Sequence, residues 1–241
     1  MTLFFAIVYL KRHQQMLSLN CSCTNYIMNY ERGLFNNSYK QHYQKAIKIL
    51  KTIIMRHISI ISSSVREGRK SHNVSLYFQN YLTENKLATT EIIDLKAYNF
   101  PIFESTLKTM VNPAINVLEF AEKIKSSDGI IIVTPEYNGG YPASLKNAID
   151  LLYEEWKHKP IAIATVSGGP FGGNQALVSL QFTLWKMMAW TIPAMFSVPT
   201  VDKAYDENGR PMDKANSDKL AAIFIKELLW CIEADKQEHT A

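Results

Sequence analysis

A polar, basic segment at residues 62–73, called loop one here, has the composition of an anion site. It reads Ser-Ser-Ser-Val-Arg-Glu-Gly-Arg-Lys-Ser-His-Asn and lies between an apolar run and a helical pattern. Hydroxyls, backbone N–H groups and a helix N-terminus therefore converge there, which favours a phosphate. Arg66 and Arg69 would add charge-assisted hydrogen bonds, and Ser71 is the expected N-cap of the helix. The alternative is a plain polar loop before a capped helix.

Loop one lacks two well-known phosphate patterns. It has no Gly-x-x-x-x-Gly-Lys-Ser/Thr, which argues against nucleoside triphosphate hydrolysis. It also has no Gly-x-Gly-x-x-Gly, so the usual dinucleotide fingerprint is missing. A phosphate bound here would therefore belong to another kind of ligand.

A second segment, loop three (residues 134–142), has features that suit a flat ring. It reads Thr-Pro-Glu-Tyr-Asn-Gly-Gly-Tyr-Pro. The paired glycines let backbone come close to a ligand. Amides at 136–138 could bond the polar edge of a heteroaromatic ring, and Tyr137 and Tyr141 could lie against its face. The alternative is a tight turn that carries a surface tyrosine.

Strand and helix patterns alternate from residue 57 onward and would position these loops. The predicted strands are His57–Ser62, Thr89–Leu95, Gly129–Thr134, Pro160–Val166 and Ile192–Val198, and the predicted helices are Ser71–Glu84, Ala114–Lys125, Pro142–Trp156, Gly173–Trp190 and Asp218–Ala234. Strict alternation predicts an α/β fold with helices on both faces of a parallel sheet. Five strands fit the doubly wound, flavodoxin-like order 2-1-3-4-5, in which ligands bind beyond the carboxyl ends of the strands.

Composition excludes several classes of protein. The chain has 241 residues, of which 47% are hydrophobic and 20% charged, as in an ordinary globular protein. Its three cysteines are too few for a disulfide framework or a four-cysteine zinc site, so we expect no metal. No run approaches the ~20 apolar residues of a membrane span. We expect a cytoplasmic protein with no membrane or nucleic-acid partner.

Residues 1–54 differ from the remainder in charge. They contain seven Lys/Arg and one acid, a net +6, so residues 55–241 carry −2 of the chain's total of +4. Three interpretations remain open: a targeting segment, a disordered native tail, or translated upstream sequence with Met55 as the natural start. The favoured interpretation is the last, which makes residues 1–54 an extension and residues 55–241 the functional domain.

Residues 134–150, which continue loop three with Ala-Ser-Leu-Lys-Asn-Ala-Ile-Asp, carry a resemblance. They resemble the Thr-Pro-Glu-Tyr-Asn…Pro-Ala-x-Leu-Lys-Asn-Ala-Ile-Asp motif of the NADPH-dependent FMN reductase family, which includes quinone, azo-dye and chromate reductases. Ser63-Ser-Val-Arg66 is similar to the family's Gly-Ser-x-Arg, with Ser63 in place of glycine. Residues 94–104 and loop four (166–173, Val-Ser-Gly-Gly-Pro-Phe-Gly-Gly) also look like family segments. The resemblance spans roughly residues 57–235.

The resemblance implies non-covalently bound FMN, with NADPH or NADH as co-substrate. Loop one would hold the phosphate, loop three would border the isoalloxazine, and loop four would close the other side of its polar edge. The implied ligands, in that order, are Ser64, Arg66, Ser71 and Asn73; Pro135, Glu136, Tyr137 and Asn138; and Ser167, Gly168 and Gly169. Because the flavin carries the chemistry, we expect no catalytic side chain. Lys146 and Asn147 are interpreted as helix surface or dimer contacts, and Asp150 as a structural cap or part of an ion pair.

The resemblance favours an FMN-dependent NAD(P)H oxidoreductase that passes hydride to a quinone, azo compound, metal oxyanion or free flavin. Such proteins usually form homodimers or homotetramers. One alternative is a flavodoxin-type electron carrier, although its hydroxyl-rich phosphate loop and acidic surface are missing. Another is a non-catalytic flavin-binding or redox-sensing module whose basic tail contacts a nucleic acid or membrane.

Overall fold

The computed structural model describes residues 55–238, and of these residues 56–238 belong to a single structural unit. The interpretations of residues 1–54 fall outside the described residues and remain expectations.

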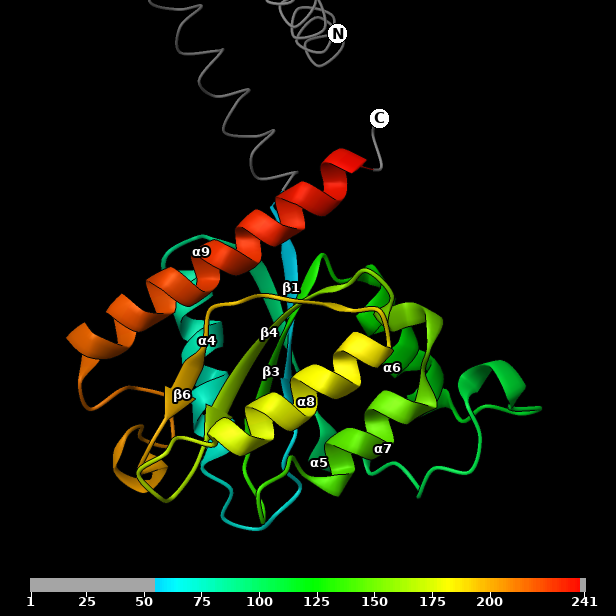
Figure 1. Ribbon diagram of the computed structural model, residues 1–241, viewed down its shortest axis with the longest axis horizontal. Coiled ribbons are helices and arrows are strands. Elements are labelled where there is room, and N and C mark those ends of the chain that lie inside the picture. The colour runs from blue at the N-terminus through cyan, green and yellow to red at the C-terminus, as the bar shows by residue number, and fades with distance from the viewer. Residues whose placement is uncertain (1–54, 239–241) are drawn as a thin grey trace, which may run out of the picture. The chain divides into compact units, whose positions relative to one another are not determined.

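The core of the fold is a parallel sheet in the order β2-β1-β3-β4-β5 (Figure 1), which confirms the predicted doubly wound order. The long strands are β1 (His57–Ser62), β2 (Thr89–Asp94), β3 (Gly129–Pro135) and β4 (Pro160–Val166). Every residue of β3 and β4 is buried, as their apolar sequences require of central strands covered on both faces.

The fifth strand differs from the prediction. A continuous strand over Ile192–Val198 was expected, but β5 (Trp190–Thr191) and β6 (Phe196–Val198) pair separately with β4. Pro193 lies in the gap, and because proline has no N–H to donate, it interrupts the ladder.

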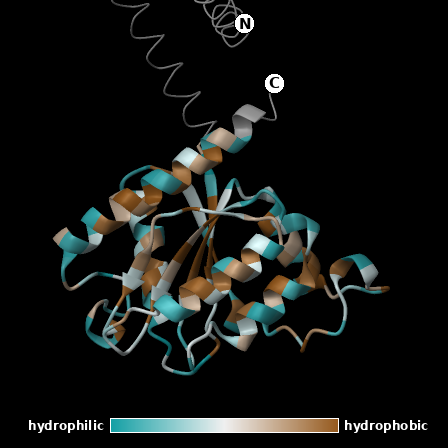
Figure 2. Cartoon of the chain, viewed as in Figure 1, coloured by the Kyte–Doolittle hydropathy of each residue, from teal (hydrophilic) through white to brown (hydrophobic). Residues whose placement is uncertain are grey.

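Five main helices cover the sheet, two on one face and three on the other. The first face carries α4 (Ser71–Glu84) and α9 (Lys214–Glu238); the second carries α6 (Ile115–Ser126), α7 (Ala143–Leu151) and α8 (Asn174–Lys186). The short elements are α5 (Leu95–Tyr98), η1 (Leu107–Thr109), η2 (Glu154–Trp156) and η3 (Val201–Lys203). Figure 2 shows hydrophobic residues concentrated in the strands, whereas the helices around them carry both hydrophobic and hydrophilic residues.

Two predicted helices are shorter than expected and one is longer. The helix expected to reach Trp156 ends at Leu151, and Trp156 turns into the core within η2 with its indole N–H bonded to Ile149 O at 3.1 Å. The helix expected to reach Trp190 ends at Lys186 because Met188 adopts φ +58°, after which Trp190 joins β5. The last helix begins at Lys214 rather than Asp218.

Strand register brings the predicted loops to one edge. Ser62 lies opposite both Asp94 and Val133, while Val166 lies opposite both Pro135 and Val198. Loops one, three and four therefore leave the sheet side by side. Within residues 55–238, no helix is long and apolar enough to cross a bilayer, and no cluster of His, Cys, Asp and Glu could hold a metal.

Candidate functional site

Loop one contains two buried hydroxyls without partners. Ser63 and Ser71 are 0% and 2% exposed, and neither Oγ has a hydrogen-bond partner in the structure. An unsatisfied buried polar group costs about 1–3 kcal/mol, so such atoms mark a place where a ligand or water completes the bonding. Ser63 does not have a positive φ, so the glycine usual in the family is not needed for this turn.

The N-terminus of α4 is open to an anion. Ser71 was expected to be the N-cap, but it is the first helical residue, and the N-cap is Lys70, whose side chain makes no capping bond. The helix also has no acid in its first turn. Free N–H groups and the positive end of the helix dipole therefore face the loop together with the Ser71 hydroxyl.

The two arginines of loop one have different roles. Arg69 is 14% exposed and binds Asp94 through two hydrogen bonds of 2.6 and 2.5 Å, while its Nη1 also donates to Ser64 O at 2.6 Å. It therefore braces the loop and is not free for a ligand. Arg66 is exposed and forms no side-chain hydrogen bond or ion pair with the described residues, so its guanidinium is available to a phosphate.

Two titratable side chains flank this brace. Burial would raise the pKa of Asp94, but the hydrogen bonds and charge of Arg69, with the Lys96 amide, outweigh it and hold that pKa below its usual value. Burial lowers the pKa of His72, an effect strengthened by Arg69 and opposed by Asp94. His72 Nδ1 lies 3.0 Å from Ser62 Oγ, so this histidine connects the start of α4 to the end of β1 at the base of the loop.

Hydroxyl groups join loop one to loop three. Ser64 Oγ and Tyr137 Oη share a hydrogen bond of 2.8 Å, and the Arg66 amide donates to the same Ser64 Oγ at 3.3 Å. At the start of α7, Ser144 Oγ donates to Ser63 O at 2.6 Å. The two loops therefore form one connected surface above the ends of β1 and β3.

Loop three is a tight reverse turn. Tyr137 and Gly140 exchange backbone hydrogen bonds of 2.8 and 3.1 Å, and Asn138 and Gly139 between them have φ of +52° and +77°. Asn138 is exposed at the tip and Pro135 is buried at the end of β3. Glu136 turns toward α8, where its Oε2 accepts from the amides of Gln175 and Ala176 at 2.9 and 3.1 Å. The backbone of Glu136 belongs to loop three, but its carboxylate binds the N-terminal amides of α8.

Loop four forms the third wall. Ser167 Oγ donates to Gly169 O at 2.9 Å, and the Ser167 amide donates to Val198 O at 3.0 Å. Gly168 and Gly169 are exposed, and a Cβ added to either would meet no atom within 3.4 Å. This open stretch leaves room for another molecule against the backbone.

Asn73 and Asn147 are held by the protein itself. Asn73 Nδ2 lies 3.4 Å from Tyr205 O, which directs it toward the loop before α9. Asn147, interpreted as helix surface or a dimer contact, instead accepts from Phe103 N at 2.6 Å and donates to Pro101 O at 2.7 Å. This contact between Asn147 and an extended segment depends on the tertiary fold, and nothing in the local sequence predicts it. Asp150 forms an ion pair, one of the two roles expected for it, and its partner is Lys146 at 2.5 Å.

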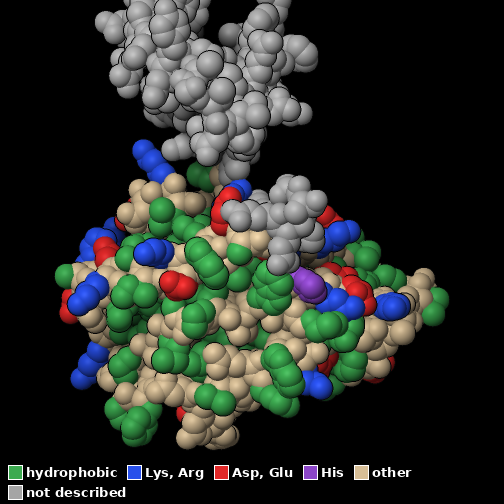
Figure 3. All heavy atoms as spheres, turned by 45° about the horizontal axis from the view of Figure 1, so that its top comes forward, with side chains coloured by type: hydrophobic (Ala, Val, Ile, Leu, Met, Phe, Trp, Pro, Cys, Tyr) green, Lys and Arg blue, Asp and Glu red, His purple; other side chains and the backbone are tan. Residues whose placement is uncertain are grey.

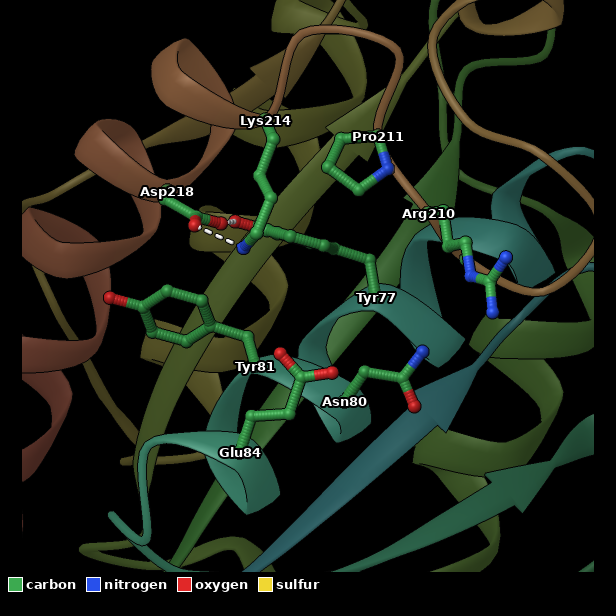
Figure 4. A pocket seen from close by; sticks show the side chains of 9 residues that line it. Tyr77, Asn80, Tyr81, Glu84, Arg210, Pro211, Lys214 and Asp218 are labelled. Carbon is green, nitrogen blue, oxygen red and sulfur yellow. Dashed lines mark hydrogen bonds and ion pairs between the residues drawn. The ribbon is translucent and has the colours of Figure 1, made fainter.

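A separate cavity of about 380 Å³ lies away from these loops (Figure 4). It lies between the second half of α4 and the segment leading into α9, and is lined by Tyr77, Asn80, Tyr81, Glu84, Gly209, Arg210, Pro211, Lys214 and Asp218. Tyr77 donates to Asp218 at 3.0 Å and Lys214 pairs with the same carboxylate at 2.5 Å. None of the residues expected to bind a cofactor lines it.

The loops together can hold a phosphorylated, planar ligand. Loop one offers unpaired hydroxyls, a free helix N-terminus and a free guanidinium, and loops three and four offer a tight turn and open backbone next to it. Among these residues no paired acid and base is arranged for proton transfer. The arrangement suits binding and orientation of a cofactor that supplies its own chemistry.

Comparison with known proteins agrees with this geometry. The sequence pattern described as NADPH-dependent FMN reductase matches residues 56–203. An NAD(P)H-dependent FMN reductase of Nectria sp is 32% identical over 142 residues, covering 56% of this chain and 70% of that protein. A quinone reductase of Pseudomonas putida is 28% identical over 178 residues, covering 68% and 92%.

Solved structures show the same fold. A flavoenzyme NAD(P)H:(acceptor) oxidoreductase from Paracoccus denitrificans has a TM-score of 0.62 at 22% identity, covering 74% of this chain and 98% of that one. The chain therefore belongs to the NADPH-dependent FMN reductase family, and is an oxidoreductase that uses FMN and NAD(P)H.

Proposed function

We propose that the chain holds FMN in loops one, three and four and passes hydride from NAD(P)H to a small electron acceptor: a quinone, an azo compound, a metal oxyanion or free flavin. The observation that carries this proposal is the pair of unpartnered buried hydroxyls, Ser63 and Ser71, beside the uncapped N-terminus of α4. The relatives named as quinone reductases and azoreductases support the quinone and azo acceptors.

The residues present fit FMN. Ser71 Oγ, the first amides of α4 and the Arg66 guanidinium would hold the phosphate, which carries negative charge that all three attract. Ser64 is tied to Tyr137 and so aligns the phosphate loop with the ring loop. Backbone of residues 135–138 would border the ring, and residues 167–169 would close its other side. Asn73, whose Nδ2 donates to Tyr205 O, would fix the first turn of α4 beside the phosphate.

FMN supplies the hydride-accepting and hydride-donating chemistry when it is bound. The chain's own residues bind it, fix its orientation and leave one face open to exchange of nicotinamide for acceptor. The exposed backbone at Gly168 and Gly169 would let the ring lie close to loop four because no side chain stands between them. We propose that the reaction takes place in the cytoplasm.

The direct test is steady-state oxidation of NADPH and of NADH by the FMN-loaded protein, with a quinone, an azo dye and free FMN as separate acceptors. The proposal expects turnover with at least one of them at a rate proportional to enzyme concentration. A flavin-loaded protein that turns over none of them contradicts the proposal. If it instead accumulates a stable one-electron-reduced form, the electron-carrier alternative is favoured.

We further propose a homodimer or homotetramer that buries the outer face of α8. Val178, Phe182 and Trp185 are 65%, 64% and 66% exposed and follow i, i+4, i+7 spacing, so they form one apolar stripe. Figure 3 shows further hydrophobic side chains among the charged ones over the face in view. Light scattering of wild-type protein and of Phe182→Ser tests this: the wild type should be an oligomer and the variant should dissociate. A monomeric wild type contradicts it.

A further inference from the structure

Helix α8 begins without a cap of its own. Its N-cap is Gly173, with φ +86°, and glycine has no side chain to accept a hydrogen bond. The first N–H groups of a helix have no partner within the helix, and leaving them unpaired is costly. In Figure 1 this end of α8 lies in the lower half of the view, above the cyan and green loops at the bottom.

Glu136 of loop three supplies the missing cap from a distant part of the chain. Its Oε2 accepts from the amides of both Gln175 and Ala176, at 2.9 and 3.1 Å. Its own amide donates to Val166 O at 3.1 Å, which continues the ladder between β3 and β4. Glu136 therefore joins loop three to the end of β4 and to the start of α8.

Two further contacts join the same turn to α8. Gly139, with φ +77°, passes so close to Gln175 that a Cβ there would lie 2.6 Å from Gln175 Oε1. Tyr141 Oη and Thr183 Oγ1 share a hydrogen bond of 2.8 Å. These contacts hold both ends of the turn, so the position of α8 determines the position of residues 136–141.

The carboxylate of Glu136 also places a negative charge on loop three, at the positive end of the α8 dipole. We infer that Glu136 is a positioning residue with two effects: its two bonds to α8 fix the loop that borders the flavin ring, and its charge lowers the reduction potential of the flavin bound there. This inference rests on the proposed binding of FMN at these loops. The charge effect has a definite sign because a reduced flavin carries more negative charge than an oxidised one and is repelled by a nearby carboxylate.

Two conservative variants of the full chain separate the two effects. Glu136→Asp retains the charge but is one methylene too short to reach both amides. Glu136→Gln retains an accepting oxygen at the same reach but removes the charge. Glu104→Gln is the matched control, because Glu104 is exposed and forms no hydrogen bond or ion pair with the described residues.

Three readouts are measured: the dissociation constant of FMN by fluorescence quenching, the potential of the bound flavin against a reference dye, and amide hydrogen exchange of residues 174–177 without FMN. Glu136→Asp should weaken FMN binding about tenfold and speed amide hydrogen exchange at Gln175 and Ala176, while the reduction potential of the bound flavin stays near the wild-type value. Glu136→Gln should weaken FMN less than threefold and raise the potential. Glu104→Gln should change none of the three.

The inference is overturned if Glu136→Asp leaves both the FMN constant and the exchange rates unchanged. It is also overturned if Glu136→Gln shifts the potential no more than Glu104→Gln does. Failure of the proposed function looks different: wild-type protein would then bind no FMN. The exchange rates at α8 would still test whether Glu136 holds the loop, because that measurement needs no cofactor.

Discussion

The partly buried ion pair between Arg69 and Asp94 should stabilise the fold and fix the shape of loop one. Its side chains are 14% and 22% exposed, the contact is bidentate, and Asp94 also caps α5 by accepting from Lys96 N at 3.0 Å. Asp94→Asn removes the charge and sets an amide N–H₂ against the guanidinium. Exposed ion pairs contribute about 0.2–1 kcal/mol to stability, and breaking a fully buried one costs about 3–5 kcal/mol. Because this pair is partly buried, we expect Asp94→Asn to lower the free energy of unfolding by about 2 kcal/mol.

The same two segments carry an internal control. Lys96 pairs with Glu67 at 2.6 Å, but Glu67 is 94% exposed and Lys96 is 42% exposed. Solvent screens such a pair, so Glu67→Gln should change the stability by less than about 0.5 kcal/mol. Both ion pairs join loop one to residues 94–96, so Glu67→Gln serves as the solvent-exposed control for Asp94→Asn.

Thermal unfolding of the cofactor-free protein by circular dichroism gives the measurement. A loss of about 2 kcal/mol should lower Tm by about 4–8 °C in a domain of this size. Because Arg69 holds the pKa of Asp94 below its ordinary value, this stability is present above the unfolded pKa of about 3.9 and is lost as pH falls through the folded value. The difference between wild type and Asp94→Asn should therefore shrink below about pH 4.

The FMN affinity should follow the same order, because Arg69 also holds Ser64 O in loop one. Asp94→Asn should weaken FMN several-fold, and Glu67→Gln should leave it unchanged. The reasoning is refuted if the two variants lower Tm equally, or if Asp94→Asn melts within about 1 °C of the wild type.

Three further predictions concern single residues. Ser71→Ala removes an unpartnered buried hydroxyl, so calorimetry should show the cofactor-free protein equally or slightly more stable while FMN titration shows about tenfold weaker binding; reduced stability with normal binding would contradict this. Arg66→Ala should weaken FMN about tenfold or more, with a smaller loss at high salt, and unaltered binding would remove it from the phosphate site. Gly209→Ala should lower the free energy of unfolding, measured by denaturant titration, by about 2–4 kcal/mol, because φ is +75° and the new Cβ would lie 2.5 Å from Tyr77 N. Gly68→Ala is the control: φ is +65° but the space is open, so the loss should be about 1 kcal/mol. Equal losses in the two variants would refute the steric part of this prediction.

Much of the fold could be predicted because its signals are local. Buried parallel strands are continuous apolar runs, so β1 and β4 begin and end at the predicted residues, as does the helix α4. The helix and strand boundaries that were predicted wrongly depend on tertiary packing. Nothing in the helical pattern before Trp156 shows that this side chain turns into the core, and only Pro193 indicates that the fifth strand is divided.

The site was predicted in part for the same reason. Loop positions follow from the order of the strands, so loops one, three and four could be placed together before the structure was known. Partners far apart in the chain could not be inferred. The bonds of Glu136 to α8, of Asn147 to residues 101–103 and of Arg69 to Asp94 depend on where helices come to rest. The expected ligand roles of the eleven residues remain predictions.

The central claim is that these loops hold FMN that NAD(P)H reduces and a small acceptor reoxidises. The most direct test is an anaerobic titration of the full chain, loaded with FMN, with NADPH while the flavin absorbance is followed. The account predicts complete bleaching at one equivalent of NADPH per flavin and full recovery on adding a quinone. A protein that stays colourless after incubation with FMN, or a bound flavin that NADPH and NADH both fail to reduce, would contradict it.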